Sequence, residues 1–496
     1  MPHPLPVDAV VFEPGALSGP GARRLVAALA RAGATTAVVA DVPGTSPRLP
    51  TAVDVVGTAA ELGERLRLAA GRAVLVRAGD SGARAPARAD AEADPGADAG
   101  ADGPLAALPA VDCGDRPVHH ALFDWLAGQL GPLEAARQLW APLDAAATSA
   151  AEERHLRLTK PPGSLGRLET VGIQLAGIAA EVPPPLPHPA AVAVFAGDHG
   201  VHRQGVSPWP QEVTAQMVAN FVAGGAAINV LARHAGAEVV VVDVGVATDL
   251  PETAEQPGPT DALGAGPRLV RRKVRAGTAD LATGPAMTVD EARRALDVGA
   301  EVAADLVARG ARCLVTGDMG IANTTPSSAL IAALTGRPAP AVTGHGAGLD
   351  PELLAHKAAL VEAAAARARA AHGDDPLAVL AEVGGLEHAA LAGFVLGGAA
   401  LQVPVVVDGV IAASALLVAT RLVPGVEAAV VAGHRSVEPG SAAVLGALGL
   451  DPMVDLGLRL GEGTGAALAL PLVEAAALIL DEMATFDQAG VSDKGA

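Results

Sequence analysis

The stretch AAVAVFAGD (Ala190–Asp198) is apolar on both faces of an extended chain and ends in one aspartate. Such strands are typical of a parallel sheet that is buried between two layers of helices. Four later stretches repeat the pattern: EVVVVDVG (Glu238–Gly245), RCLVTGD (Arg312–Asp318), VPVVVDG (Val403–Gly409) and AAVVAGH (Ala428–His434). Ala-rich segments separate them, and strands that alternate with helices indicate an α/β fold. The chain from about Leu133 to residue 490 is therefore predicted to form one α/β domain, a parallel sheet with helices on both faces.

Each of these stretches has a polar residue at or near its end. The five are Asp198, Asp243, Asp318, Asp408 and His434. In open parallel sheets, ligands bind beyond the carboxyl ends of the strands, so these residues mark the predicted site. Strand-end aspartates also cap the helices that follow them, and this alternative must hold for some of the five.

A smaller α/β domain is predicted for residues 1–82. Its expected strands are Ala9–Glu13, Thr35–Asp41 and Ala73–Asp80, and its expected helices are Gly21–Gly33 and Thr58–Gly71. Residues 83–104 are rich in Ala, Asp, Gly and Pro and lack apolar anchors, which predicts a flexible linker. Residues 105–132 contain a helical segment, HHALFDWLAGQL (His119–Leu130), and the large domain is predicted at 133–490.

The first domain faintly resembles a haloacid-dehalogenase-type core, whose aspartate nucleophile would stand in VVFEPGALS (Val10–Ser18). Glu13 and Pro14 replace the Asp-x-Asp of that family, which implies that the domain does not catalyse by that mechanism. The alternatives are an unrelated α/β domain and a regulatory or scaffold role for residues 1–131.

The composition argues against several classes of protein. The chain has 496 residues, a net charge of -19 and only 2% aromatic residues. Proteins that bind nucleic acids usually carry basic patches or stacking aromatic side chains, so no nucleic-acid partner is expected. The two cysteines, Cys113 and Cys313, suggest no disulfide framework. Together with an N-terminus unlike a signal peptide, they predict a cytoplasmic location.

The region most like a membrane span is Ala389–Thr420, but it is interrupted by Gly397-Gly398, Gln402, Pro404 and Asp408. A spanning helix tolerates such residues poorly. The region is predicted to form a helix, a buried strand, a turn and a second helix, and no membrane partner is expected.

Two glycine-rich turns, a lysine and a serine at a strand end predict a phosphate-containing ligand. TGDMGIANTTPSSA (Thr316–Ala329) places Asn323, Thr324 and Thr325 at a helix start, where backbone amides bind anions. VTGHGAGLDPELLAHKAALV (Val342–Val361) adds Lys357, and AGHRSVEPGS (Ala432–Ser441) adds Arg435 and Ser436.

A lone carboxylate stands in GLRLGEGTG (Gly457–Gly465), where Gly461 and Gly463 flank Glu462. One interpretation is a helix start, with Thr464 as the cap and an acid favoured near the helix N-terminus. The other is a carboxylate at a loop tip, where glycine lets a ligand approach the backbone closely.

The pair Asp198-His199 raises the question of a metal site. No His, Cys or Asp cluster at metal-ligand spacing accompanies it, so no metal is expected. A metal-dependent phosphohydrolase of a nucleotide-like substrate, using Asp198, His199, Asp243 and Asp318, is the alternative enzyme.

Together the motifs closely resemble one family, nicotinate-nucleotide–dimethylbenzimidazole phosphoribosyltransferase, which acts in synthesis of the cobalamin lower ligand. The resemblance covers roughly Leu133 to Gln488 and rests on these segments: KPPGSLGRLE (Lys160–Glu169), DHGV (Asp198–Val201), VTAQMVANF (Val213–Phe221), DVG (Asp243–Gly245), GDMGIANTT (Gly317–Thr325), VGG (Val383–Gly385), HRSVEPG (His434–Gly440) and RLGEGTGAALALPLVEAA (Arg459–Ala476). It implies transfer of the phosphoribosyl group of nicotinate mononucleotide to 5,6-dimethylbenzimidazole or a related base, which gives α-ribazole 5'-phosphate and nicotinate without a cofactor. It also implies a homodimer, with a Rossmann-like large domain and a small helical domain made from both ends of the family region.

The resemblance assigns roles to individual residues. Glu462 matches the general base, and Asp318, where a glutamate is expected in some relatives, would support it. Gly320, Asn323 and Thr324 would line the nucleotide, with Lys357 and Ser436 near its phosphate. Trp209, Met217 and Leu460 are expected to form an apolar pocket for the base, and Met319 is a further substrate-binding position. Because Trp209 and Met217 stand where a serine and a glutamine are often found, base choice is expected to be loose.

Overall fold

The structure is a computed structural model. It describes residues 9–12, 28–29, 35–39, 53–56, 73–77, 110–112, 117–250, 266–346, 348 and 350–492. The chain divides into two compact units, Met1–Ala141 and Pro142–Ala496. The predicted linker at 83–104, Cys113 and nearly all of the helices predicted in the first domain lie outside the described residues.

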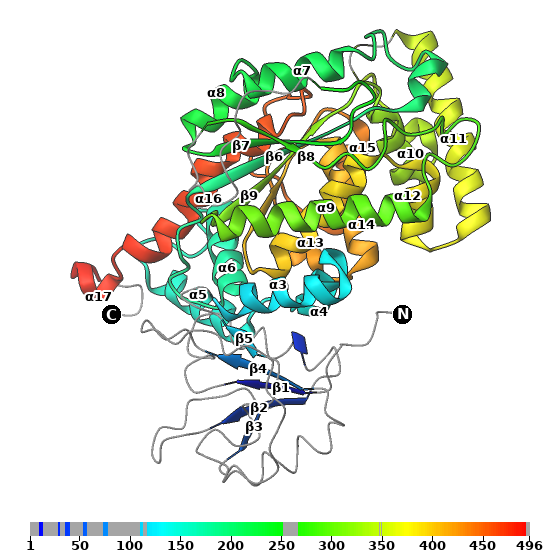
Figure 1. Cartoon of the computed structure of the whole chain (residues 1–496). Helices are drawn as coiled ribbons and strands as arrows, with labels where there is room; N and C mark the ends of the chain where they lie inside the picture. Colours follow the sequence, from blue (N-terminus) through cyan, green and yellow to red (C-terminus); the bar gives the residue numbers. More distant parts are fainter. Residues whose placement is uncertain are drawn as a thin grey trace, which may run out of the picture. The chain divides into compact units, whose positions relative to one another are not determined.

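A six-stranded parallel sheet forms the centre of the second unit (Figure 1). Its strands are β6 (Ala190–Gly197), β7 (Glu238–Gly245), β8 (Arg268–Arg271), β9 (Cys313–Met319), β10 (Val405–Val407) and β11 (Val430–Ala432). They are ordered β11-β10-β9-β6-β7-β8, which is the strand order of the Rossmann fold. The order reverses between β6 and β9, and a crevice at such a reversal is where ligands of these sheets bind.

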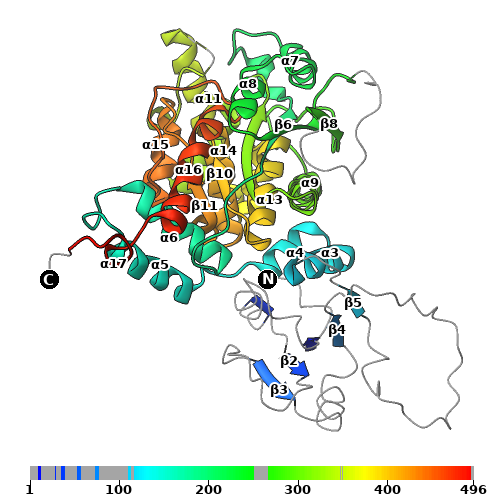
Figure 2. The same cartoon turned by 90° about the vertical axis from the view of Figure 1, so that its left-hand side faces the viewer.

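Helices cover both faces of this sheet, as predicted (Figure 2). One face carries α13 (Leu386–Ala400) and α14 (Val410–Leu422), with α9 (Val289–Ala308) packed on α13. The other carries α6 (Arg167–Ala179), α7 (Val213–Val222), α8 (Ala227–His234) and α16 (Thr464–Glu482). The strands are buried on both sides because their Val and Ala side chains meet apolar helices on each face.

Small residues let the layers approach closely. Val192 and Val241 of the sheet pack in one cluster with Ala466 and Val473 of α16. On the opposite face, a Cβ atom at Gly393 of α13 would collide with the backbone of Leu296 in α9. Few aromatic side chains are therefore needed to fill this core.

The other helices of the second unit are α5 (Ala145–Arg157), α10 (Thr324–Thr335), α11 (Pro351–His372), α12 (Pro376–Val383), α15 (Pro439–Leu448) and α17 (Phe486–Ala489). α5 and α6 pack against the long helix α16. Thr159 also donates its backbone N–H to Ala484 O at 3.1 Å. Segments from the start and the end of the second unit thus form one helical layer.

The first unit contains a parallel sheet of five strands, ordered β3-β2-β1-β4-β5. They are β1 (Ala9–Phe12), β2 (Thr35–Val39), β3 (Val53–Val56), β4 (Ala73–Arg77) and β5 (Ala110–Asp112), and α3 (Val118–Leu130) and α4 (Pro132–Leu139) follow. The three predicted strands and the helix HHALFDWLAGQL are confirmed. β3 and β5 were not predicted.

In the second unit all five predicted strands are present, with ends shifted by no more than a few residues, and Ala389–Thr420 has the predicted helix–strand–turn–helix order. The strand β8, with the sequence RLVR, was missed because it is short and has charged ends. By length and composition alone, Val213–His234 and Thr464–Glu482 could span a membrane. The first comprises α7 and α8 with a break between them, and the second is α16, which packs on the sheet.

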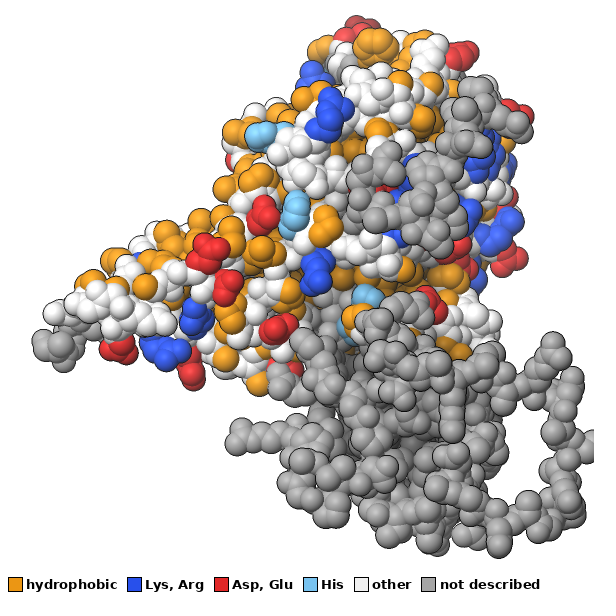
Figure 3. Space-filling model, turned by 60° about the vertical axis from the view of Figure 1, so that its left-hand side comes forward, with side chains coloured by type: hydrophobic (Ala, Val, Ile, Leu, Met, Phe, Trp, Pro, Cys, Tyr) orange, Lys and Arg blue, Asp and Glu red, His pale blue; other side chains and the backbone are white. Residues whose placement is uncertain are grey.

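Acidic and basic side chains are interspersed on the face shown in Figure 3, among apolar and small side chains. No single basic patch appears among the described residues on that face.

Candidate active site

The predicted site residues gather at the carboxyl ends of β6, β9, β10 and β11, around the point where the strand order reverses. Asp198 and His199 follow β6, Asp318 ends β9, Asp408 follows β10, and His434 follows β11. All five side chains are buried. The sheet brings these residues to one edge because all of its strands run in the same direction.

The loop that carries Glu462 has left-handed backbone at three successive residues. The φ angles of Gly461, Glu462 and Gly463 are 82°, 64° and 92°. The angles at Gly461 and Gly463 are favourable only for glycine. Glu462 itself adopts a backbone conformation that is uncommon for a residue with a side chain. The loop lies directly on β9, since a Cβ atom at Gly317 would stand 2.6 Å from Glu462 O.

The side chain of Glu462 is 6% exposed, and its Oε2 accepts a hydrogen bond from Ile228 N, in the first turn of α8, at 3.3 Å. Burial raises the pKa of Glu462 above its ordinary value, and the nearby charge of Asp408 adds to this rise. The Ile228 amide acts in the opposite direction, because it favours the carboxylate. The result is a desolvated carboxylate whose affinity for a proton exceeds that of an ordinary glutamate.

Asp408 caps α16, the helix that follows Glu462. Its carboxylate accepts hydrogen bonds from Ala466 N at 2.9 Å and Gly463 N at 3.2 Å. Thr464 does not cap the helix, since its hydroxyl donates to Gly461 O at 2.8 Å. His434 Nε2 lies 3.3 Å from Asp408 Oδ1. Burial lowers the pKa of His434, but Asp408 outweighs burial and raises it above the ordinary value.

Asp318 lies against the Glu462 loop, because a Cβ atom at Gly461 would stand 3.0 Å from Asp318 Oδ2. That oxygen accepts a hydrogen bond from Asn323 Nδ2 at 3.0 Å, and Oδ1 has no hydrogen-bond partner. Burial, together with the charge of Asp408, raises the pKa of Asp318 well above its ordinary value. Asp318 therefore binds a proton more readily than a typical aspartate.

Lys357 is fully buried on α11, beside the start of α10. Its ammonium group donates to Thr324 Oγ1 at 2.8 Å and to Gly344 O at 3.1 Å. Burial lowers its pKa to about 8. Gly346 of the same turn donates its N–H to Glu438 Oε1 at 2.8 Å. The sequence predicted that Lys357 lies near a phosphate but gave no sign that it is buried.

Ser436 lies on the β11 side of this region and is buried. Its hydroxyl accepts a hydrogen bond from Glu438 N at 3.3 Å. The backbone of Gly409 is close to it, since a Cβ atom there would stand 3.8 Å from Ser436 Oγ. Ser436 thus lies between the turn after β10 and Glu438, the residue that accepts the N–H of Gly346.

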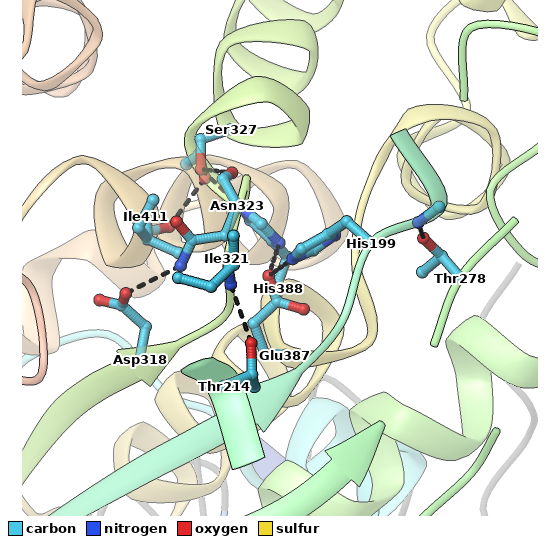
Figure 4. Close-up of polar contacts among 12 residues, drawn as sticks. His199, Thr214, Thr278, Asp318, Ile321, Asn323, Ser327, Glu387, His388 and Ile411 are labelled. Carbon is cyan, nitrogen blue, oxygen red and sulfur yellow. Dashed lines mark hydrogen bonds and ion pairs between the residues drawn. The ribbon is translucent and has the colours of Figure 1, made fainter. Parts of the chain in front are cut away.

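Four buried polar side chains beneath the turn at Gly320 form a connected network (Figure 4). Glu387 Oε1 lies 2.9 Å from His199 Nε2 and 2.7 Å from His388 Nδ1, and His388 Nε2 lies 2.7 Å from Ser327 Oγ. Burial alone would raise the pKa of Glu387, but the two histidines hold it below its ordinary value. Glu387, in turn, outweighs burial and raises the pKa of His199.

Sequence reasoning singled out His199 but missed Glu387, His388 and Ser327. The available signal was the pair Glu387-His388 at the start of an otherwise apolar helix, directly after the VGG motif (Val383–Gly385).

The predicted residues of the base pocket have different environments. Trp209 is 51% exposed and Leu460 is 59% exposed. Met217 and Met319 are partly buried and pack against the same hydrophobic cluster beneath the sheet ends. Thr214, one turn before Met217 on α7, accepts a hydrogen bond from Ile321 N at 3.1 Å, which ties α7 to the turn after β9 (Figure 4).

The two remaining strand-end aspartates bind backbone amides. Asp198 Oδ2 accepts from Ala247 N at 2.8 Å, and Asp243 Oδ1 accepts from Val246 N at 2.9 Å. No group of three or more His, Cys, Asp or Glu side chains that could hold a metal ion is found within the described part of the chain. Ala247 and Val246 do not lie in a helix, and Asp408 caps α16 rather than α14, the helix after its own strand. None of these three aspartates therefore caps the helix that follows its strand, and the capping alternative is wrong for them.

A family model described as phosphoribosyltransferase matches residues 140–491. The protein named nicotinate-nucleotide–dimethylbenzimidazole phosphoribosyltransferase from Salinispora tropica is 57% identical over 356 residues, which cover 71% of this chain and 97% of that protein. The chain belongs to this family. A protein of the same name from Chloroflexus aurantiacus is 55% identical over 353 residues, covering 71% of this chain and 96% of the relative.

Solved structures agree with this assignment. The structure named CobT from Thermus thermophilus is 50% identical and has a TM-score of 0.65, and the match covers 70% of this chain and 99% of the other. Family membership makes the chain a phosphoribosyltransferase and confirms the resemblance drawn from its motifs. The comparisons support the transferase and not the metal-dependent phosphohydrolase.

Proposed function

We propose that this enzyme transfers the 5-phosphoribosyl group of nicotinate mononucleotide to 5,6-dimethylbenzimidazole or a related base. The products are α-ribazole 5'-phosphate and nicotinate. The observation that carries the proposal is the buried carboxylate of Glu462, held on left-handed backbone between two glycines at the carboxyl ends of the strands. The name shared by its relatives supports the choice of substrates.

The reaction is a single displacement at C1' of the ribose. The bond from C1' to the pyridinium nitrogen breaks, and nicotinate leaves with the electron pair. A ring nitrogen of the benzimidazole forms the new bond from the opposite face, which converts a β-linked substrate into an α-linked product. The pyridinium ring is already a good leaving group, so the enzyme does not need a strong acid.

The incoming base, however, must lose a proton. Its second ring nitrogen carries a hydrogen, and without removal of that proton positive charge builds up on the new base. We assign the removal of this proton to Glu462, since a poorly solvated carboxylate with a raised pKa is suited to act as a general base. Asp318 is assigned a supporting role: its raised pKa suits a hydrogen-bond donor or a secondary proton acceptor beside Glu462.

The nucleotide is assigned to the turn after β9. Gly320, Asn323 and Thr324 would line it, and Lys357 and Ser436 would lie near its phosphate. The supporting geometry is the contact between the Lys357 ammonium and Thr324 Oγ1 at the start of α10, because a helix N-terminus and a buried cation both favour an anion. The apolar base is assigned to the side formed by Trp209, Met217, Met319 and Leu460.

We further propose that the enzyme is a cytoplasmic homodimer. The sequence, with its two cysteines, supports the location, and the family resemblance supports the dimer. Light scattering after size-exclusion chromatography measures the mass, and a mass of one chain contradicts the dimer.

Product analysis tests the proposed reaction. Nicotinate mononucleotide and a panel of benzimidazoles are incubated with the full chain, and the products are separated by chromatography. We expect nicotinate and an α-linked ribotide in equal amounts, unaffected by a chelator. Release of inorganic phosphate that a chelator abolishes would instead indicate a metal-dependent phosphohydrolase.

A further inference from the structure

The network of His199, Glu387, His388 and Ser327 has no part in the proton transfer assigned to Glu462. It lies at the point where the strand order reverses: His199 follows β6, Glu387 and His388 open α13, and Ser327 is in the first turns of α10. Each of these side chains is essentially inaccessible to solvent. The polar groups are therefore shielded from solvent.

Stability alone is a weak explanation for such a network. Removing two imidazoles and a carboxylate from water is costly, and well-packed apolar residues of similar size often serve stability as well or better. The contacts of Glu387 with the two histidines are at ion-pair distance, but their angles are not those of hydrogen bonds. The contacts that the network makes with predicted site residues explain its presence better.

The network extends to two predicted site residues. Ser327 Oγ donates to Asn323 O at 2.9 Å and lies 2.7 Å from His388 Nε2. Asn323 in turn donates its side-chain amide to Asp318 Oδ2 at 3.0 Å. At the other end, a Cβ atom on Gly320 would stand 3.1 Å from His199 Nε2. The turn from Gly320 to Asn323 therefore rests on the network at both ends.

We propose that His388 and Ser327 are positioning residues that, with Glu387 and His199, hold Asn323 in the geometry that binds the nucleotide. This inference rests on the proposed function, because it assigns the turn after β9 to nicotinate mononucleotide. The link between His388 and Ser327 is the point at which the network meets α10. Breaking it removes a contact of α10 while Glu462 and Lys357 themselves stay unchanged.

Two substitutions break this link from opposite sides. Ser327→Ala removes the hydroxyl. His388→Asn retains an amide near Glu387 but is too short to reach Ser327. Each variant is expected to raise the KM for nicotinate mononucleotide about threefold to tenfold, as for the loss of one hydrogen bond. The KM for the base and kcat should stay within about twofold, since the link lies away from Glu462.

The double variant and a matched control distinguish positioning from packing. Because both substitutions remove the same link, the double variant should raise KM no more than the larger single effect. Ser414→Ala on α14 is the control: this hydroxyl is equally buried and donates to Ile411 O at 2.7 Å, outside the network. It should lower Tm and leave KM unchanged.

Several results would overturn the inference. An unchanged KM in Ser327→Ala, with a loss of Tm like that of Ser414→Ala, would show a purely structural network. Multiplying effects on KM in the double variant would show that the two residues act separately. If Ser327→Ala does not fold, the KM of His388→Asn for nicotinate mononucleotide tests the inference alone, and an unchanged KM would overturn it. A wild-type enzyme that releases no nicotinate would instead contradict the proposed function, and with it this inference.

Discussion

Asp408 and Glu462 are joined through the backbone of the next residue, since the Asp408 carboxylate accepts the N–H of Gly463 at 3.2 Å. One aspartate thus anchors the start of α16 and, through its charge, raises the pKa of Glu462 beyond the effect of burial. The cap of the helix and the proton affinity of the proposed base therefore depend on the same carboxylate.

Replacing Glu462 by Gln should lower kcat about 10²- to 10⁴-fold, the usual contribution of a positioned general base. The change keeps the shape of the side chain and removes its basicity. The KM for nicotinate mononucleotide should change little, because Lys357 and the turn after β9 are untouched. Steady-state kinetics with both substrates varied measures this, and Asp318→Asn should cost less. Near-normal kcat at saturating substrates would contradict the role of Glu462.

Affinity for the nucleotide should depend on pH through Lys357. Burial lowers the pKa of its ammonium group to about 8, so the free enzyme loses this charge as the pH rises through that value. We expect kcat/KM for nicotinate mononucleotide to decline above about pH 8, with a slope that approaches a tenfold loss per pH unit.

Lys357→Met tests the origin of this decline. The variant should have a KM about 10- to 100-fold higher at pH 7, as for the loss of a hydrogen bond to a charged group, and kcat/KM that is flat between about pH 7 and 9. A pH profile that keeps its decline in the variant would assign it to another group.

Stability should depend strongly on Asp408. Asp408→Ala leaves the amides of Gly463 and Ala466 buried without their acceptor and should lower the free energy of unfolding by about 2–5 kcal/mol. The matched control is Asp375→Ala, which removes an exposed cap of α12 and should cost about 1 kcal/mol. Urea unfolding followed by circular dichroism compares the two. Equal costs would show that burial adds nothing to the cap.

Base choice should be broad. Trp209 and Met217 offer contact area rather than directed hydrogen bonds, and one methyl group of apolar fit discriminates by about 1–3 kcal/mol. Unsubstituted benzimidazole should therefore have a kcat/KM within about a hundredfold of the dimethyl form. Direct competition between the two bases measures the ratio. A far larger preference would require polar groups in the pocket that the assigned residues do not supply.

The first unit should be dispensable for the reaction. The family match begins at residue 140 and the second compact unit at Pro142. A protein truncated to start at Leu133 should fold and show wild-type kcat and KM. A second truncation, starting at Leu105, retains α3 and α4 and serves as the comparison. Loss of activity in both would show that residues before Leu105 are needed for the catalytic domain.

The sequence by itself determined the strands, the polar residues at their ends and the identity of the family. These features are local: an apolar run bounded by glycine and aspartate defines a buried strand, and Glu462 is conspicuous because glycines flank it. β8 escaped prediction for the same reason, because four residues with charged ends do not form such a run.

Only the tertiary structure decided what each polar side chain contacts. Asp408 caps a helix whose N-cap residue, Gly463, lies 55 residues further along, rather than the helix that follows its own strand. Lys357, which the sequence placed near a phosphate, is buried against Thr324. His199 meets Glu387 because β6 and α13 lie side by side in the fold. A parallel sheet brings its strand ends to one edge regardless of their separation in the chain, and that proximity leaves no periodic trace in the sequence.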